Sequence, residues 1–463
     1  MANYYPYADR YPVNRRMPEK GRPRDEVLAE LREMASAEDG FWQTGRCSGT
    51  MYCGDMEHYA YMTEAFGMYS HVNALQRDMC PSATRFEGEI IAMTLDMLHA
   101  HEAREGATPC GGVTSGGTES IMSSVLAHRE WARNTRNIAA PQMILPETAH
   151  VAFEKSAYLF GLEVIKAPVD PKTTLVDVDF VRDHITDRTA LLVGSACNYG
   201  YGTVDPIREL SDLAVKHDIG LHVDGCLGGW ILPWGQELGY DVPVFDFRLP
   251  GVTAISADTH KYGYGPKGSS VVCFRDKEIR SGLYFIQQEW SGGKYLSPGI
   301  AGSRSGGILA ATWASLVHLG REGYLRYAKR IFETSYAMQD IIRGFPELYL
   351  MGTPYFCFSF RSDEFDIYHL NDAMRERGWR FNGQQHPNAL HMCVTRPQTQ
   401  DGVVEAFERD LTDAVAYAKN PAQEKAKTGA VYGGLPKGDT AALDFVEGIM
   451  VNMLDAHQDV PAE

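Results

Sequence analysis

The sequence has 463 residues, of which 44% are hydrophobic and 22% charged, as is typical of a folded globular protein. Acidic residues number 60 and basic residues 44, which gives a formal charge of −16. Sequence-independent binding to nucleic acid needs a positive field, so this charge argues against nucleic acid as a partner. The length suits two or three domains or lobes.

Nine cysteines occur, an odd number with no Cys-x-x-Cys pair. This pattern favours free thiols in a reducing compartment, and neither cysteines nor histidines show the spacing of a metal site. The longest apolar stretch, near Gly307–Leu319, is too short to cross a bilayer, and the first twenty residues lack the apolar core of a signal peptide. We therefore expect a cytoplasmic protein with no transmembrane segment and no metal.

The chain opens with an arm, residues 1–24, rich in tyrosine and proline and without periodicity, followed by a predicted helix at 25–35. Beyond residue 110, short apolar segments alternate with helical ones. Strands are predicted at 142–146, 163–169, 189–195, 220–224, 252–257 and 269–274, and helices at 120–134, 151–160, 178–185 and 207–217. This alternation predicts an α/β fold with a mainly parallel sheet covered on both faces.

A second pattern begins after a long predicted helix at 323–342. A strand at 355–360, a helix at 365–377 and a strand at 390–395 indicate a smaller C-terminal α/β domain. We therefore divide the chain into an N-terminal arm and helix (1–70), a large cofactor-binding domain (71–330) and a small domain (331–463).

A glycine-rich segment, Cys110–Ser120 (CGGVTSGGTES), precedes a helix predicted to start near Thr118. Glycines allow close approach of the backbone, and the unpaired N–H groups of a helix N-terminus attract anions. The segment therefore suits a phosphate, although taken alone it also fits a turn with an ordinary capping threonine.

Two charged residues follow predicted strands. Asp224 ends the strand at 220–224, and Lys261 follows the strand at 252–257, close to Asp258 and His260. Ligands of open α/β sheets bind beyond the carboxyl ends of the strands. A partly desolvated lysine there can have a lowered pKa and form a Schiff base. Taken singly, Asp224 also fits a loop or cap residue, and Lys261 a surface lysine.

The order of these features fits pyridoxal 5'-phosphate. Thr118 would meet its phosphate, Asp224 its pyridine nitrogen and Lys261 its aldehyde. An acidic partner keeps the nitrogen protonated, so that the ring withdraws electrons from bonds at the amino carbon of a substrate. His150 follows another predicted strand and is a candidate to stack on the ring.

Four segments carry a resemblance to the sphingosine-1-phosphate lyases: CGGVTSGGTESI (110–121), HVDGCLGGW (222–230), SADTHKYGYGPKGSS (256–270) and AGSRSGGI (301–308). The similarity extends from about Ser48 to Tyr432. It implies fold type I of the pyridoxal-phosphate enzymes, the aspartate-aminotransferase-like fold, and a homodimer whose active sites are shared between subunits.

The resemblance also implies the roles of individual residues. The catalytic residues would be Lys261, Tyr199 and His150. The cofactor would be bound by Gly117, Thr118, His150, Asp224, Asp258, His260 and Lys261, with Ser303 reaching in from the second subunit. The substrate would be bound by Asn73, Gln76 and Lys267, together with Tyr52 from the partner subunit.

Two segments depart from the family pattern. The chain has NALQRD at 73–78 where the family commonly has Asn-Pro-Leu-His-Pro-Asp, so that Gln76 replaces a histidine. Glutamine can donate a hydrogen bond but carries no charge, and Arg77 is a candidate to compensate. Tyr199 is followed by Gly200 and Tyr201, where the family tends to have proline and histidine. Both departures lie on the substrate side, whereas the cofactor side is intact.

The resemblance implies pyridoxal-phosphate-dependent retro-aldol cleavage of sphingosine 1-phosphate, or a related phosphorylated long-chain base, to a long-chain aldehyde and phosphoethanolamine. It indicates a bacterial-type member without the membrane anchor of eukaryotic members. Three alternatives stay open at this point: a decarboxylase of an aromatic or acidic amino acid, a lyase acting on another phosphorylated amino alcohol, and a non-enzymatic binding protein.

Overall fold

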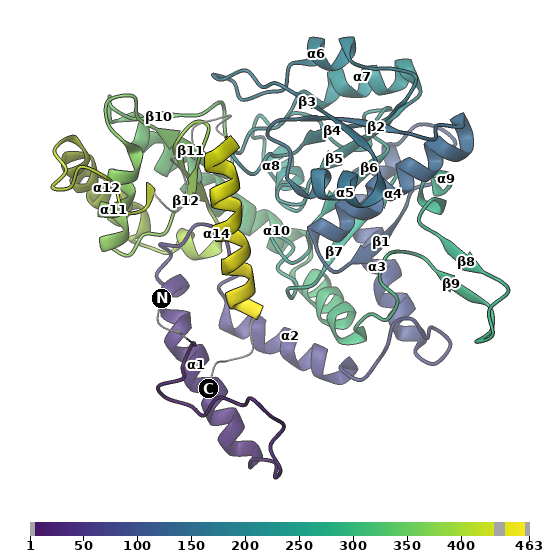
Figure 1. The fold of residues 1–463 in the computed structure, drawn as a ribbon, viewed down its shortest axis with the longest axis horizontal. Coiled ribbons are helices and arrows are strands. Elements are labelled where there is room, and N and C mark those ends of the chain that lie inside the picture. Colours follow the sequence, from purple (N-terminus) through teal and green to yellow (C-terminus); the bar gives the residue numbers. More distant parts are fainter. Residues whose placement is uncertain (1–4, 430–439, 459–463) are drawn as a thin grey trace.

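The computed structural model describes residues 5–429 and 440–458. Its centre is a seven-stranded sheet in the order β1-β7-β6-β5-β4-β2-β3 (Figure 1). β7 pairs antiparallel with both neighbours, and all other pairs are parallel. The strands are β1 (Cys110–Thr114), β2 (Gln142–Pro146), β3 (Glu163–Ala167), β4 (Thr189–Ser195), β5 (Gly220–Asp224), β6 (Ala254–Ala257) and β7 (Ser270–Phe274). The predicted α/β class and mainly parallel sheet are confirmed.

Helices cover both faces of this sheet, which is why its strands are apolar throughout. Leu191 and Val193 of β4 pack with α4 and α5, whereas Leu192 between them packs with α7 on the other face. The helices of this part are α3 (Pro81–Met97), α4 (Gly117–Arg136), α5 (Ala152–Phe160), α6 (Val178–Asp183), α7 (Ile207–His217), α8 (Leu232–Glu237) and α9 (Lys277–Ser281). The four predicted helices here match α4, α5, α6 and α7 within a few residues.

Two features of the sheet differ from the prediction. Residues 110–114 form a strand, β1, where only a turn was expected, because Gly111 and Gly112 hide the strand pattern. Gly111 is needed there, since a Cβ would lie 2.7 Å from the carbonyl oxygen of Val272 in β7. The antiparallel direction of β7 was also not expected.

A smaller antiparallel sheet has the order β10-β11-β13-β12, with α11 (Ile367–Glu376) and α12 (Val403–Lys419) beside it. Its strands are β10 (Tyr349–Leu350), β11 (Cys357–Arg361), β12 (Asn382–Gln384) and β13 (Ala389–Cys393). The predicted strand–helix–strand pattern is confirmed. α10 (Gly306–Arg343) contains the predicted helix 323–342 and has one non-helical residue, Gly320. The predicted domain boundary at 330 falls within α10 and stays a prediction.

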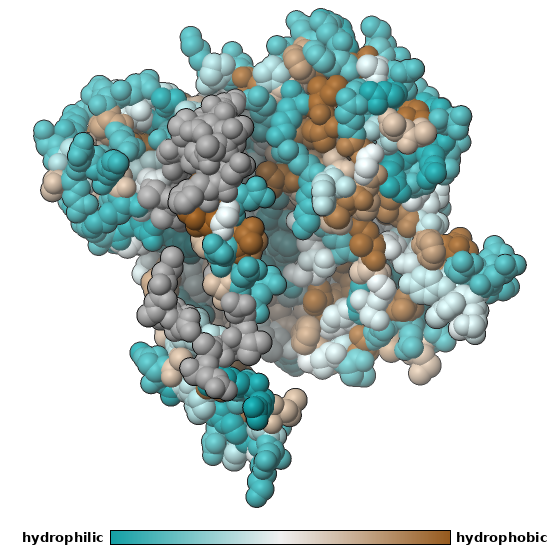
Figure 2. Space-filling view, viewed as in Figure 1, coloured by the Kyte–Doolittle hydropathy of each residue, from teal (hydrophilic) through white to brown (hydrophobic). Residues whose placement is uncertain are grey.

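The remaining elements lie around these two units. Residues 5–23 form turns without helix or strand, as expected for the arm, and α1 extends well beyond the predicted 25–35 and projects from the body (Figure 1). Hydrophilic residues predominate around the rim of the face in Figure 2, in keeping with the acidic composition. Tyr432, where the family resemblance ends, lies outside the described residues. The elements are α1 (Arg24–Gln43), α2 (Met56–Tyr69), η1 (Ala100–Glu102), β8 (Phe285–Gln287), β9 (Tyr295–Ser297), η2 (Arg396–Thr399) and α14 (Thr440–Gln458).

Gly202 ties the loop after β4 to the small sheet. Its φ is +74°, and a Cβ would lie 1.9 Å from the carbonyl oxygen of Cys357 in β11. We expect Gly202→Ala to lower the free energy of unfolding by about 3 kcal/mol. Gly239→Ala is the matched control, because Gly239 also has positive φ (+84°) but no atom near its Cβ position. Urea unfolding curves test this, and equal losses in the two variants would contradict it.

Candidate active site

The carboxyl ends of β2, β4, β5 and β6 meet at one edge of the large sheet. The loops that leave them carry His150, Tyr199, Asp224 and Lys261, so the topology brings the predicted residues to the same edge. His150 is exposed at the start of α5, where its Nδ1 accepts from the N–H of Ala152 at 3.1 Å. This bond fixes the ring at the entrance of the helix.

Lys261 lies in a tight turn after β6, beside a cluster in which the hydroxyls of Thr259 and Thr312 both hydrogen-bond to the hydroxyl of Ser269. Its Nζ lies 2.9 Å from Oδ2 of the buried Asp258. Burial opposes the charged form of Lys261, but the Asp258 carboxylate outweighs it and raises the pKa of Lys261 above its usual value. The expectation of a lowered pKa is therefore wrong for the side chain paired in this way.

The N-terminus of α4 packs directly against this turn. A Cβ on Gly117 would lie 2.8 Å from both Oδ2 of Asp258 and Sγ of Cys226, so only glycine fits. Thr118 follows in the first turn, whose N–H groups have no partner within the helix. Nearby, Nδ1 of His260 and Oδ1 of Asp258 are buried without a hydrogen-bond partner among the described residues. The helix N–H groups, the His260 ring and the close backbone approach suit a cofactor phosphate, whereas the Asp258 carboxylate only accepts hydrogen bonds.

Asp224, the last residue of β5, is buried and firmly held. Its Oδ1 accepts from the hydroxyl of Ser256 at 3.1 Å and from the N–H of Cys226 at 3.0 Å. A carboxylate fixed in this way at the strand edge suits a protonated ring nitrogen. The donor set at this edge, with Lys261 for an aldehyde, therefore fits pyridoxal phosphate.

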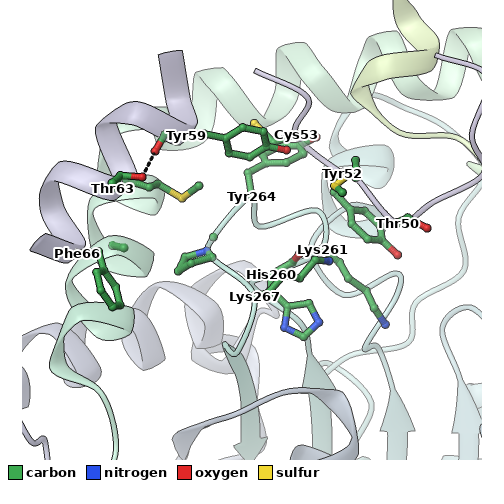
Figure 3. Close-up of a pocket in the computed structure, with 15 residues that line it drawn as sticks. Thr50, Tyr52, Cys53, Tyr59, Thr63, Phe66, His260, Lys261, Tyr264 and Lys267 are labelled. Atoms are coloured by element: carbon green, nitrogen blue, oxygen red, sulfur yellow. Dashed lines mark hydrogen bonds between the residues drawn. The ribbon is translucent and has the colours of Figure 1, made fainter. Parts of the chain in front are cut away.

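A cavity of about 310 Å³ opens beside Lys261 (Figure 3). Lys267 lies over the ring of Tyr52, with Nζ 4.8 Å from its centroid, and donates to the carbonyl oxygen of His260 at 3.3 Å. Burial, together with repulsion by Lys261, lowers the pKa of Lys267. Most other lining residues are apolar or aromatic, among them Met62, Phe66 and Tyr264. The cavity thus combines cationic groups with an apolar wall.

The expectation that Tyr52 serves the site of a partner subunit stays a prediction. Tyr52 lines the cavity of its own chain, next to Lys261 and Lys267. Its segment is fixed there by β13 and the loop that follows: Gly49 N–H donates to the carbonyl of Cys393 at 2.9 Å, and Thr395 Oγ1 donates to the carbonyl of Met51 at 3.0 Å. These contacts join residues more than 340 apart, so no local pattern could reveal them.

Three other predicted residues lie in a separate region. Asn73 Nδ2 donates to Ser303 Oγ at 3.0 Å, and Gln76 is exposed nearby in the same segment. A second cavity of about 780 Å³ runs along this segment and the loop carrying Ser303. That Ser303 reaches a partner's site, and that Asn73 and Gln76 bind substrate, stay predictions.

Arg77 does not stand free to replace the missing histidine charge. It donates to Oε2 of Glu87 at 2.6 Å, and Arg304 donates to both oxygens of the same carboxylate. The hydrogen bonds and charge of these arginines outweigh burial and lower the pKa of Glu87. The suggestion that Arg77 compensates for Gln76 therefore has no support in the structure.

Sequence reasoning missed His391, whose ring packs against that of Tyr199. The two rings are 4.7 Å apart, and His391 is fully buried on β13 with no partner for either nitrogen among the described residues. Burial lowers the pKa of His391 to about 3, so the ring is neutral. Its position in an otherwise apolar strand gave the only sequence signal.

Comparison with known proteins places this geometry in a family. The model of the pyridoxal-dependent decarboxylase conserved domain matches residues 6–359. The sphingosine-1-phosphate lyase of Arabidopsis thaliana is 42% identical over 93% of this chain and 78% of that protein, and sphingosine-1-phosphate lyase 1 of Rattus norvegicus is 40% identical over 90% and 72%. The chain belongs to the sphingosine-1-phosphate lyase family.

Solved structures agree with this membership. The sphingosine-1-phosphate lyase of Burkholderia pseudomallei K96243 matches with a TM-score of 0.93 and 55% identity, over 99% of this chain and 100% of that one. The glutamate decarboxylase of Lactobacillus brevis, at 20% identity and a TM-score of 0.75, shares the fold. Fold type I and a dependence on pyridoxal phosphate are thus confirmed for this lyase-family chain.

Other properties of this family member can be read from the structure. No helix among the described residues is long and apolar enough to cross a membrane. Within residues 5–429 and 440–458, no group of three or more His, Cys, Asp or Glu could hold a metal ion. All nine cysteines lie in the described residues and are free thiols.

The Asp258–Lys261 ion pair predicts how Lys261 reacts in the cofactor-free protein. Asp258→Asn removes the carboxylate but leaves the burial, so the pKa of Lys261 should fall. Each unit of fall gives about tenfold more uncharged amine at a given pH. Reductive methylation followed by mass spectrometry across a neutral-to-alkaline pH series measures this, with exposed Lys172 as internal control. An unchanged profile for Lys261 would contradict the role of Asp258.

Proposed function

We propose that the chain cleaves sphingosine 1-phosphate, or a related phosphorylated long-chain base, to a long-chain aldehyde and phosphoethanolamine. The observation that carries this proposal is the cavity where Lys261 and Lys267 lie beside Tyr52 and an apolar wall. A lysine suits the substrate phosphate, and the apolar side chains suit the carbon chain. The identity to proteins named sphingosine-1-phosphate lyases supports it.

Lys261 would also bind the cofactor, together with residues at the carboxyl edge of the large sheet. Lys261 would hold the aldehyde of pyridoxal phosphate, Asp224 its nitrogen, and the first turn of α4 with Gly117 and Thr118 its phosphate. His150 would lie against the ring and Ser303 of the partner subunit against the phosphate. When bound, the cofactor supplies an electron sink for the bond at the amino carbon.

The other steps depend on side chains of this chain. The proton on the substrate hydroxyl must leave before the carbon–carbon bond breaks, and Tyr199 and Lys261 are the candidates to accept it. Tyr52 and Lys267 would hold the phosphate and so orient the hydroxyl toward them. The apolar wall, with Met62 and Phe66, excludes water from the reacting carbon.

We further propose a cytoplasmic homodimer. The β8–β9 hairpin exposes Phe285, Ile286 and Leu296, and an apolar surface of this kind is typical of a subunit contact. A partner would also bring its Ser303 near Nδ1 of His260, which has no hydrogen-bond partner among the described residues. The nine free thiols support a reducing compartment.

The first test of the proposed function concerns Lys261. Lys261→Ala should abolish product formation, because it removes the amine that would bind the cofactor aldehyde. Mass spectrometry of the reaction with sphingosine 1-phosphate would detect the long-chain aldehyde and phosphoethanolamine. Lys172→Ala, at an exposed lysine, is the control and should keep activity. Aldehyde production by Lys261→Ala would refute the assignment. Amine and carbon dioxide from an amino acid, with the lipid untouched, would instead identify a decarboxylase.

The second prediction concerns Lys267. Lys267→Met keeps the length of the side chain but removes the charge, so kcat/KM for the phosphorylated base should fall about tenfold or more. The unphosphorylated base should lose little, because it lacks the group that Lys267 binds. Steady-state kinetics with both compounds measures the difference. An equal loss for the two substrates would show that Lys267 does not recognise the phosphate.

A further inference from the structure

A continuous line of buried polar side chains leads away from Asp224 through the large sheet. Ser256 Oγ donates to Asp224 Oδ1 at 3.1 Å and lies 3.0 Å from Nε2 of His222. On the other side of the His222 ring, Nδ1 lies 2.7 Å from Oγ of Ser124 in α4. All four residues are at least nine-tenths buried.

The line continues from Ser124 to a second histidine. Nδ1 of His128 lies 2.8 Å from the carbonyl oxygen of Ser124 and 3.3 Å from its hydroxyl. Nε2 of His128 lies 2.8 Å from the hydroxyl of Thr253, just before β6. Five side chains from two strands, one helix and one loop thus connect to a residue of the cofactor site.

The direction of every proton in this line follows from its two ends. Burial lowers the pKa of His222 to about 3 and that of His128 to about 4, so each ring is neutral and carries one N–H. At the near end a carboxylate only accepts, so Ser256 donates to Asp224. Ser256 must then accept from Nε2–H of His222, which leaves Nδ1 of His222 bare.

The hydrogen bonds of His128 give the same direction for the Ser124 hydroxyl independently. A carbonyl oxygen also only accepts, so Nδ1 of His128 must carry the proton that faces the Ser124 carbonyl. Nε2 of His128 then faces the hydroxyl of Thr253 at 2.8 Å, and that hydroxyl also donates to the carbonyl oxygen of Leu221 at 3.0 Å. The Ser124 hydroxyl is left to donate to the bare Nδ1 of His222, as the near end requires. The donors of Ser124, His222 and Ser256 therefore point toward Asp224, whereas His128 donates to the backbone carbonyl of Ser124.

We propose that Ser256, His222 and Ser124 form a one-way hydrogen-bond chain that holds the Asp224 carboxylate in place. Aligned donors polarise one another, which strengthens the last bond to the carboxylate. Ser256 and His222 are thus positioning residues for the reaction. This inference rests on the proposed function in one respect, namely that Asp224 faces the cofactor nitrogen.

The first test needs no activity and no cofactor. Protein labelled with ¹⁵N-histidine gives ring signals that distinguish the two neutral tautomers, and His222→Gln and His128→Gln assign them by removal. We expect the Nε2–H tautomer for His222 and the Nδ1–H tautomer for His128. The opposite tautomer at His222, or a charged ring at either position near neutral pH, would overturn the proposal.

The second test measures pyridoxal phosphate binding by absorbance. Ser256→Ala removes the donor to Asp224, so Kd should rise about tenfold or more, and the absorbance band of the bound cofactor should change its pH dependence. Ser124→Ala removes the donor to Nδ1 of His222 and should have a smaller effect of the same kind. Ser211→Ala is the control, because Ser211 is equally buried and accepts from Gly251 N–H at 2.8 Å but lies outside the chain of donors.

The outcomes separate this inference from the proposed function. If Ser256→Ala binds the cofactor as the unmodified protein does, or if Ser211→Ala loses as much affinity and shows the same band change, the positioning role is refuted. If the expected tautomers and the losses of pyridoxal phosphate affinity are found but sphingosine 1-phosphate is not cleaved, only the proposed substrate is wrong. If the protein binds no pyridoxal phosphate, the proposed cofactor chemistry fails, and the tautomers alone decide whether the chain of donors exists.

Discussion

The pairing of β5 with β6 is the contact on which the site depends, because it places Asp224 directly opposite Ser256. The same strand, β6, leads within four residues to Lys261, so the distance between carboxylate and lysine is fixed by the sheet. Two buried strands held by ladder hydrogen bonds position these groups better than mobile loops could. The cofactor side of the site is therefore part of the core.

Charges placed so close to a core must be compensated, and the chain does this in two ways. Lys261 is paired with Asp258, whereas Asp224 has no cation in hydrogen-bond contact among the residues that the structure describes and is held by neutral donors. Neutral donors leave the negative charge of Asp224 available to an incoming group, which a paired cation would not. The difference suits a lysine that forms a covalent bond and a carboxylate that only attracts a proton.

The sequence predicts the cofactor side well because each residue there follows a strand within a short segment. Asp224, Lys261 and Thr118 could be found from local patterns and strand order, whereas the family resemblance supplied Gly117. The substrate side could not, because Tyr52 and His391 reach the site through packing between segments hundreds of residues apart. Arg77 shows the same limit: its partners, Glu87 and through it Arg304, depend on tertiary structure. β1 was missed because glycine has a low strand propensity. Gly111 is present there because the neighbouring strand β7 leaves no room for a Cβ.

The departure from the family pattern at Gly200 and Tyr201 also belongs to the substrate side of the site. Tyr52 and Tyr199 both rest on the small sheet, the first through β13 and the second against His391. Gly200 in the Tyr199 loop accepts from Ser359 and Gln384 of the same sheet. Gly200 and Tyr201 therefore lie in a loop that contacts the small sheet. In the proposed function, this sheet would thus affect which substrate binds, while the large sheet holds the cofactor.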